Sequence, residues 1–388
     1  MKQLDRRNVL EILGGDKRRY HTCVMTAFTF DFLFFERRVL PVVRRTGVKN
    51  INVFVDKNEL ASSVEMAGPK SFAGHHAYSL IDVATKGVFH PKIMLLLGKS
   101  EGMLVVGSGN LTGSGLSSND EIWSAFHFKD VIHPHAVLFA QAWDYISKWF
   151  SNARGVHREK LAWIKRDVPW ISELSNSSEA IEISDVRYAL IHNGNTDNHW
   201  SALANLSFKA DTMTLVAPYY DRDGKTINEL IKLFNPNETT CIVDDSTGKP
   251  PVKFEMERDD VTFYRWHNCI QREDEFNGRL HAKMIHLING DEEVLYLGSA
   301  NITVQALGEK HANDEAGVLL RRARKKNSWL EEMGIRTKER IKEFNQNKFD
   351  FESNKAKEIL RATDVLDDIQ VNGQQVQIFT SQSIDIKS

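Results

Sequence analysis

The sequence predicts an α/β protein built from two similar halves, on three observations. Its 388 residues exceed what one hydrophobic core usually supports. A short motif occurs twice, because His90 and Lys92 precede one apolar run and His281 and Lys283 precede another. Each copy follows segments in the order strand, helix, strand. A repeat of this kind indicates two like units that share one architecture.

The first half follows an expected N-terminal helix in residues 1–21. Residues 23–30 are rich in β-branched and aromatic side chains and predict a strand. Residues 31–45 have helical spacing, although Pro41 must kink this helix or start a new turn. Residues 51–56 alternate as a buried strand that ends on a carboxylate. A β-α-β unit therefore leads into the first motif.

The second half repeats this order. Residues 213–217 predict a strand, residues 225–234 a helix and residues 241–244 the next strand. Between the halves, residues 134–150 carry large apolar side chains at helical spacing, which is typical of a helix packed on a core. The expected elements thus form two matching sets around one intervening helix.

Local identities align the two halves. Met25-Thr26 matches Met213-Thr214, and Asp56 matches Asp244, in both cases at a separation of 188 positions. The two copies of the motif lie 191 positions apart. Only small insertions are therefore expected between the halves.

These patterns divide the chain into five segments. Residues 1–21 are the N-terminal helix and residues 22–155 the first half. Residues 156–180 are expected to be a linker, and residues 181–328 form the second half. Residues 329–388 are predicted as a helical C-terminal extension that ends in a hairpin, whose turn is marked by adjacent Asn and Gly residues.

Composition excludes several classes of protein. Charged residues make up 26% of the chain and the net charge is −2, so a nucleic-acid-binding surface would have to be local. Three scattered cysteines without a Cys-x-x-Cys pair argue against a zinc site and a disulfide framework, and fit a reducing cytoplasm. The most apolar stretch, residues 24–35, is too short and too polar to span a bilayer. With a charged N-terminus that lacks a signal peptide pattern, we expect a cytoplasmic protein without a membrane partner.

The repeated motif places polar groups at one spot. Side chains two residues apart on a strand share a face, so the histidine and lysine of each pair point the same way. In the second copy Asn289-Gly290 marks a hairpin turn that brings the end of the next apolar run back towards the histidine. The returning segments are Gly107-Ser108-Gly109-Asn110 and Gly298-Ser299-Ala300-Asn301, followed by Asn119-Asp120-Glu121 and Asn313-Asp314-Glu315. Each glutamate could orient a histidine.

This set of groups suits phosphodiester transfer. One histidine would attack phosphorus, while the other protonates the leaving oxygen and then activates water. The groups expected to hold the phosphate oxygens as charge builds are Lys92, Lys283, Asn110, Asn301, Ser108 and Ser299. Each histidine is paired with a lysine rather than with carboxylates or cysteines, so no metal site and no cofactor are predicted.

The doubled pattern His-x-Lys and Gly-Ser-x-Asn resembles the phospholipase D superfamily over about residues 22–320. The resemblance implies two similar α-β-α halves with mixed central sheets, related by a pseudo-twofold axis, with the active site between them. It also implies a metal-independent reaction through a covalent phosphohistidine. Glu121 and Glu315 match the carboxylates that orient the histidines of that superfamily. Its habit would make His90 the nucleophile and His281 the acid, although the pseudo-symmetry leaves this choice open.

One departure from the superfamily pattern bears on the substrate. Leu97 and Ile288 occupy the positions five residues beyond the lysines, where the superfamily usually has aspartate. Nucleic-acid branches such as tyrosyl-DNA phosphodiesterases and some metal-independent restriction endonucleases resemble this chain in lacking it. We therefore predict cleavage of nucleic acid, DNA rather than RNA, by an endonuclease. By analogy, it would act in prokaryotic defence or restriction, alone, as a homo-oligomer or with a protein partner.

Two other functions remain open at this point. The first is a phospholipase or other lipid phosphodiesterase, which uses the same chemistry on another leaving group. The second is a non-catalytic nucleic-acid-binding subunit of a multi-protein system. The basic run at residues 321–326 could guide a nucleic-acid backbone or be a solvated helix face. His286 and His311 have no counterpart in the first half and are predicted to be structural or surface residues.

Overall fold

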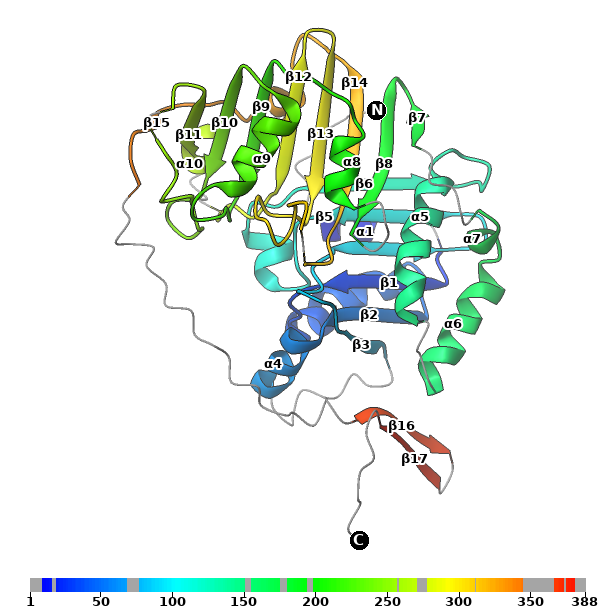
Figure 1. The fold of residues 1–388 in the computed structure, drawn as a ribbon. Coiled ribbons are helices and arrows are strands. Elements are labelled where there is room, and N and C mark those ends of the chain that lie inside the picture. The colour runs from blue at the N-terminus through cyan, green and yellow to red at the C-terminus, as the bar shows by residue number, and fades with distance from the viewer. Residues whose placement is uncertain are drawn as a thin grey trace.

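The computed structural model contains two mixed β-sheets with helices on both faces of each (Figure 1). It describes residues 9–15, 19–67, 77–150, 155–174, 180–193, 198–256, 258–270, 278–310 and 312–344, and the backbone of 366–372 and 375–380. Within this part of the chain, the α/β prediction of two similar halves is confirmed.

The first half is built on a six-stranded sheet with the order β3-β2-β1-β4-β5-β6. Its strands are β1 (Thr22–Ala27), β2 (Asn50–Asp56), β3 (Ser79–Val83), β4 (Ile93–Leu97), β5 (Gly102–Gly107) and β6 (Trp123–Phe128). Strands β1, β2 and β3 run parallel to one another, and each of β4, β5 and β6 is antiparallel to the strand before it in the sheet. The central strands β1, β2, β4 and β5 are buried along their whole length, as expected for apolar runs covered on both faces.

The second half contains a nine-stranded sheet with the order β15-β11-β10-β9-β12-β13-β14-β8-β7. Its strands are β7 (Ile181–Ile183), β8 (Val186–His192), β9 (Thr212–Ala217), β10 (Glu238–Val243), β11 (Val261–Arg265), β12 (Met284–Asn289), β13 (Glu292–Gly298), β14 (Ala316–Ala323) and β15 (Arg340–Ile341). Its central six strands, β11-β10-β9-β12-β13-β14, repeat the order of the first sheet. Strands β7, β8 and β15 extend its edges.

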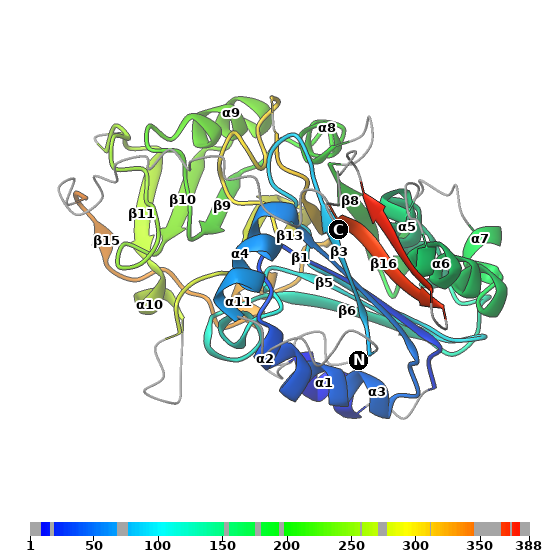
Figure 2. The same cartoon turned by 90° about the horizontal axis from the view of Figure 1, so that it is seen from below.

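Helices cover both faces of the first sheet. Figure 2 shows α1, α2 and α3 on one side and α5, α6 and α7 on the other. The elements of this half are α1 (Val9–Gly15), α2 (Phe32–Phe34), π-helix η1 (Phe35–Val39), α3 (Leu40–Arg45), α4 (Lys57–Ala67), π-helix η3 (Ser114–Ser118), α5 (Ala136–Ser147), 3-10 helix η4 (Lys148–Phe150), α6 (Gly155–Asp167) and α7 (Trp170–Glu173). The π-turn of η1 precedes Pro41, which lacks the N–H that a regular helix would need there.

The second sheet is covered in the same way. Helices α8 (His199–Ala204) and α9 (Lys225–Phe234) pack on one face, and α10 (Trp266–Cys269) and α11 (Trp329–Glu332) on the other. Most of the segment predicted as a linker forms α6 and α7, which pack on the core of the first half. None of the described helices is long and apolar enough to cross a membrane.

The strand register corrects part of the sequence alignment. Met25 of β1 faces Val53 of β2, whereas Leu215 of β9 faces Cys241 of β10. Because Val53 and Cys241 occupy equivalent places, Met25 corresponds to Leu215 and not to Met213. The pairings of β4 and β12 lead to the same register. A shift of two residues preserves the alternation of faces along a strand, so the sequence pattern cannot detect it.

The two halves exchange short extended segments. Phe89 pairs with Asp314, and Leu280 pairs with Asp120. The Asp-Glu segment of each half therefore lies beside the residues that precede the histidine of the other half. The backbone N–H of His90 donates to the Asp314 carbonyl over 2.8 Å, and the Asp120 N–H donates to the Arg279 carbonyl, also over 2.8 Å. These reciprocal contacts join the halves at the motif itself.

The C-terminal extension differs from its prediction. Helix α11 begins at a capping box on Ser328 and is short, because the chain turns at Gly334 with φ of 76°. Residues 333–344 are not helical, and β15 instead joins the edge of the second sheet. The remainder of the predicted helix, to about residue 361, lies outside the described residues. The backbones of β16 (Leu366–Asn372) and β17 (Gln375–Thr380) pair antiparallel where the hairpin is expected.

The basic run at residues 321–326, which begins within β14, does not lie at the motif. Arg322 is buried and bonds to Glu293 over 2.5 Å and to Glu332 over 3.0 Å. Glu293 also lies 3.0 Å from the His286 ring, so His286 belongs to a structural ion network. The later residues of the run are exposed at the end of β14 farthest from the motif.

Candidate active site

Each histidine–lysine pair precedes a central strand. His90 and Lys92 lead into β4, and His281 and Lys283 lead into β12. Both lysines are buried, and each ammonium donates a hydrogen bond of 2.6 Å to the carbonyl of its own histidine. The alternation predicted from the sequence therefore places each imidazole and ammonium on the same side of the strand.

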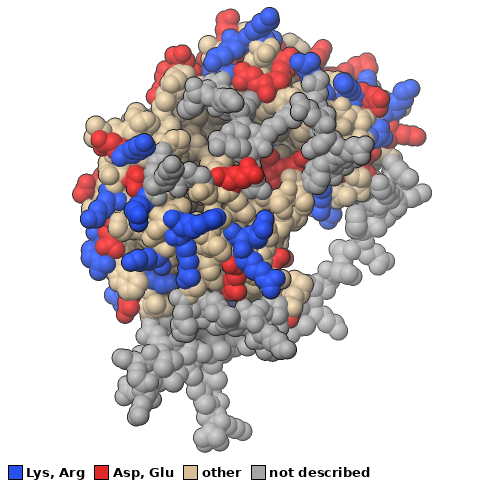
Figure 3. Space-filling view, turned by 180° about the vertical axis from the view of Figure 1, so that it is seen from behind, with Lys and Arg blue, Asp and Glu red and all other residues tan. Residues whose placement is uncertain are grey.

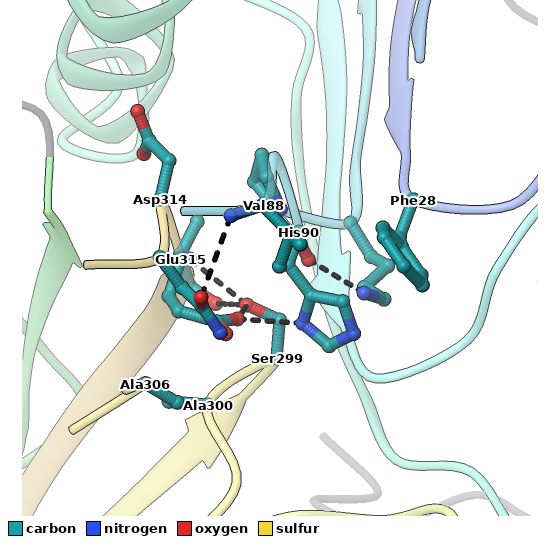
Figure 4. A network of polar contacts seen from close by, with 12 residues as sticks. Phe28, Val88, His90, Ser299, Ala300, Ala306, Asp314 and Glu315 are labelled. Atoms are coloured by element: carbon teal, nitrogen blue, oxygen red, sulfur yellow. Dashed lines mark hydrogen bonds and ion pairs between the residues drawn. The ribbon is translucent and has the colours of Figure 1, made fainter. Parts of the chain in front are cut away.

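Each histidine is held by a glutamate from the other half. His90 Nδ1 lies 2.7 Å from Glu315, and His281 Nδ1 lies 2.8 Å from Glu121. Figure 4 shows the Glu315 carboxylate bonded to both Ser299 and the His90 ring, with the other nitrogen of that ring pointing away from the carboxylate. Because the pairs are crossed, neither half alone contains a fully oriented histidine.

The two serines of the motif support the glutamates. Ser299 Oγ donates to Glu315 over 2.5 Å, and Ser108 Oγ donates to Glu121 over 2.5 Å. An asparagine two residues before each glutamate donates to it as well. Both serines are completely buried. Each serine hydroxyl thus donates its proton to a buried carboxylate, and the role of the serines as phosphate ligands stays a prediction.

The glycines before these serines are needed for close packing. A Cβ on Gly107 would collide with the Ile122 carbonyl oxygen, and one on Gly298 would collide with the backbone of Gly317. Both contacts are to backbone, which cannot move aside as a side chain can. Glycine thus lets each motif strand approach the neighbour that carries the glutamate.

The two asparagines of the motif are not equivalent. Asn110 Oδ1 accepts from the backbone N–H groups of Phe28 at 3.2 Å and Thr29 at 3.4 Å, which leaves its amide nitrogen as the donor. In the second half Pro218 occupies the place of Phe28 and has no N–H. The Oδ1 atom of Asn301 is buried and has no hydrogen-bond partner among the described residues. The two halves therefore present different environments to a bound anion.

Burial disfavours the protonated form of both imidazoles when no anion is bound. It lowers the pKa of His90 well below the usual value, and the charges of Lys92 and Lys283 lower it further. The pKa of His281 is lowered to about 4, first by burial and then by the charge of Lys283. With each Nδ1 bonded to a carboxylate, the proton of a neutral ring lies on Nδ1 and the lone pair on Nε2.

The carboxylates and ammonium groups are also perturbed. Burial raises the pKa of Glu315 to about 7, although Lys92 and the Ser299 bond oppose it. For Glu121 the bond from His281 and the nearby cations outweigh burial, so its pKa is lowered. Burial lowers the pKa of Lys283 to about 8. Groups of one half shift the pKa values of the other, so the two histidines, two lysines and two glutamates gather at the junction of the halves.

The donor set favours an anion. Among the described residues, no group of three or more His, Cys, Asp and Glu side chains is placed to hold a metal ion. Lys92 and Lys283 instead contribute two ammonium groups beside the imidazoles. Two such donors match a tetrahedral oxyanion, and their positive charge would repel a divalent cation.

Two residues near the site escaped the sequence prediction. The Phe28 ring packs against His90 with ring centroids 5.2 Å apart, and Lys92 lies 5.9 Å from that ring. Arg279 lies two residues before His281 on the same extended segment. Reading the alternation one step upstream of the motif would have found Arg279. Phe28 carries no such signal, because only its position after β1 brings it to the histidine.

Comparisons with known proteins match the fold. No family model matches the chain, and no curated protein matches it in sequence. The structure of yeast tyrosyl-DNA phosphodiesterase matches with a TM-score of 0.53 at 14% identity, over 84% of this chain and 88% of that one. A mutant of the same enzyme matches with a TM-score of 0.50 at 14% identity, over 80% of this chain and 84% of that one.

A third match is partial. Nuc from Salmonella typhimurium, described as a phospholipase D family member, has a TM-score of 0.26 at 16% identity, over 37% of this chain and 82% of that one. The long matches show that the chain has the predicted phospholipase D-like α/β fold, with two similar halves and mixed central sheets.

Proposed function

We propose that this protein is a metal-independent phosphodiesterase that cleaves nucleic acid through a covalent phosphohistidine. The observation that carries the proposal is the crossed arrangement of His90 with Glu315 and His281 with Glu121. It supplies two oriented imidazoles at one junction, each accompanied by a lysine. A nucleophile and an acid on opposite sides of one phosphorus are the requirement of an in-line displacement.

In the first step His90 is the nucleophile. Its Nε2 lone pair attacks phosphorus, and a P–N bond forms as the bond from phosphorus to the leaving oxygen breaks. His281 enters this step protonated on Nε2 as well, a state that the negative charges of Glu121 and of the bound phosphate favour, and it gives that proton to the leaving oxygen. Lys92 and Lys283, with the Asn110 amide, stabilise the charge on the non-bridging oxygens. Glu315 holds the His90 Nδ1 proton and balances the positive charge that develops on the ring.

In the second step the same groups release the product. His281, now neutral, takes a proton from water as the water oxygen attacks phosphorus. The P–N bond breaks and His90 regains its lone pair. The phosphate monoester leaves, and His281 carries the proton that the next cycle requires.

The assignment of the two histidines rests on the asymmetry of their partners. His90 is the more buried of the two rings. Its partner Glu315 takes up a proton more readily than Glu121, since burial raises the pKa of Glu315 to about 7. His281 faces Glu121, whose pKa is lowered and which therefore stays ionised. A carboxylate stabilises a protonated imidazole better than a carboxylic acid does. These partners favour His90 as nucleophile and His281 as acid.

Nucleic acid is the substrate that agrees best with the chain. One solved structure with a similar fold is named a tyrosyl-DNA phosphodiesterase. The net charge is −2, but Figure 3 shows Lys and Arg side chains gathered on the lower part of one face. The helical segment of η1 and α3 exposes four arginines, namely Arg37, Arg38, Arg44 and Arg45. Local positive surface of this kind attracts a phosphate backbone.

The absence of aspartate at positions 97 and 288 is compatible with turnover. Leu97 is buried at the far end of β4, five residues beyond Lys92, which corresponds to about 16 Å along a strand. Ile288 has the same place on β12. Neither position can reach the group held by the lysines.

A substrate panel with and without chelator tests the proposal. Plasmid DNA, single-stranded DNA, RNA and choline lipids would be incubated with purified protein in EDTA. We expect cleavage of DNA that EDTA leaves unchanged, together with a protein-bound phosphate that is labile in acid. Loss of cleavage in EDTA with recovery in magnesium would contradict the mechanism. Cleavage of the lipid alone would move the function to lipid phosphodiesters, and binding without any cleavage would make the chain a non-catalytic subunit.

The roles of Glu315 and Glu121 can be distinguished by testing each variant on substrates with different leaving groups. Glu315→Gln should lower kcat/KM about 10²- to 10³-fold on both an oligonucleotide and thymidine 5′-p-nitrophenyl phosphate, because it weakens the nucleophile. Glu121→Gln should cost as much on the oligonucleotide and under tenfold on the nitrophenyl ester, which needs no acid. The exposed Glu309→Gln is the matched control. Equal losses for both variants on both substrates would contradict the assignment.

The pH profile should be a narrow bell on the nitrophenyl ester. Below pH about 7 Glu315 takes up a proton and stops supporting His90, so kcat/KM rises with pH through that value. Above pH about 8 Lys283 loses its proton and its charge, so kcat/KM falls. Glu315→Gln should remove the acid limb and Lys283→Arg the alkaline limb, because a guanidinium stays protonated. A profile that is flat from pH 6 to 9 would refute this reading.

A further inference from the structure

The second half carries a cation that the first half lacks. Arg279, His281 and Lys283 occupy alternate positions of one extended segment, so their side chains share a side. The position 191 residues before Arg279 is Val88, which is uncharged. Arg279 is exposed, whereas Lys283 is buried. The row of cations on this side thus runs from the buried phosphate position out to the surface.

The Arg279 guanidinium is held in place. Its Nη2 donates to the Tyr219 hydroxyl and, over 3.2 Å, to the Thr247 carbonyl, and its Cζ lies 5.8 Å from the centre of the Tyr219 ring. Both bonds use Nη2, so the Nη1 and Nε donors are not committed to any described residue. An arginine fixed by an aromatic ring loses little freedom when it binds an anion.

The fixed guanidinium lies beside the candidate active site. Its charge is one of the causes that lower the pKa of Lys283. Tyr219 follows Pro218, the residue that takes the place of Phe28 near the second asparagine. Its place two residues before His281 on the same extended segment, and its bond to Tyr219, put Arg279 next to the phosphate position on the second-half side. On the first-half side, the corresponding neighbour of His90 is the ring of Phe28.

We propose that Arg279, positioned by Tyr219, binds the phosphate group next to the scissile one. The substrate is then a strand with at least two successive phosphodiesters, and it lies in one direction, with its extra phosphate on the His281 side and an uncharged group against Phe28. A guanidinium binds a phosphate through two parallel N–H bonds, which suits this site better than an ammonium. The inference rests on the proposed function, because it assigns a second subsite of the same reaction.

The test compares one phosphodiester with many. Wild type, Arg279→Gln and Arg279→Lys would be assayed at pH 7 on thymidine 5′-p-nitrophenyl phosphate and on a twelve-nucleotide oligothymidylate. Arg279→Gln should lower kcat/KM on the oligonucleotide about 10- to 100-fold and change the nitrophenyl ester less than threefold. Arg279→Lys should recover part of the loss. Tyr219→Phe should raise KM for the oligonucleotide only, and the exposed Arg324→Gln controls for the loss of one charge.

A binding measurement separates this inference from the proposed function. Fluorescence anisotropy of the labelled oligonucleotide as a function of salt should give a slope of log Kd on log salt that is smaller by about 0.7 in Arg279→Gln and unchanged in Arg324→Gln. If the wild type cleaves neither substrate, the proposed function fails, and this slope still decides the subsite. Equal losses on both substrates, or an unchanged slope, would overturn the role of Arg279.

Discussion

Replacing His90 by alanine should lower turnover at least about 10⁴-fold on every phosphodiester, activated or not. The reason is that no other group can form the P–N bond, because the second imidazole stands on the leaving-group side. The measurement is kcat/KM on an oligonucleotide and on thymidine 5′-p-nitrophenyl phosphate. No covalent adduct should be detectable by mass spectrometry in either case.

Two controls accompany the His90 variant. The exposed His133→Ala should retain full turnover. The double variant His90→Ala/His281→Ala should be no worse than His90→Ala alone, since residues that act on one reaction are not additive. A His90→Ala protein that releases nitrophenol in a burst would show that His281 is the nucleophile.

Replacing His281 by alanine should have a different outcome on each substrate. On an oligonucleotide kcat should fall about 10³- to 10⁴-fold, because the leaving alkoxide is no longer protonated. On the nitrophenyl ester the first step should proceed, since nitrophenolate leaves without an acid. The intermediate should then persist, because no base activates water. We expect a burst of about one nitrophenol per protein, with a nucleotide bound to His90.

The properties of the trapped adduct test which histidine is the nucleophile. It should be acid-labile, map to the peptide that contains His90, and be absent in the double variant. Glu121→Gln should show a weaker form of the same burst, because it acts through His281. Steady turnover of His281→Ala on the oligonucleotide at the wild-type rate would contradict a shared site.

The crossing of the two pairs explains why the halves cannot act separately. Glu315 follows the hairpin of the second half but serves His90, and Glu121 serves His281. The same crossing passes through the backbone, because the segment before each glutamate pairs with the segment before the opposite histidine. Separation of the halves would therefore remove the orienting carboxylate from both imidazoles at once.

Much of this arrangement could be predicted from the sequence. The elements around the motif were expected within a few residues, since central strands are apolar runs and α9 has a clear amphipathic pattern. A new helical element, α3, begins next to Pro41, where a kink or a new turn was expected. The hairpin expected at Asn289-Gly290 also forms, with Gly290-Asp291 as its two turn residues. The strand predicted at 23–30 is shorter, because Phe28 and the two residues after it turn toward the motif.

Other features lay beyond sequence reasoning for definite physical reasons. Met25 was aligned with Met213 instead of Leu215, because a shift of two residues keeps every side chain on its face. The bonds from the two motif serines to Glu121 and Glu315 were not predicted, because a hydroxyl can donate to a carboxylate as well as to a phosphate. Only the packing of β5 against β6, and of β13 against β14, shows which acceptor each one has.

The sequence by itself determined which chemical groups the site contains. The reason is that a strand directs alternate residues to one side, so the pattern His-x-Lys is enough to place an imidazole and an ammonium group together. The tertiary structure decided how those groups are paired, because the contacts between His90 and Glu315 and between His281 and Glu121 span more than 150 residues of chain. It also made the halves unequal, since Pro218 and Arg279 acquire meaning only beside Asn301 and Lys283. Long-range contact of this kind follows from the packing of two sheets and cannot be read along the chain.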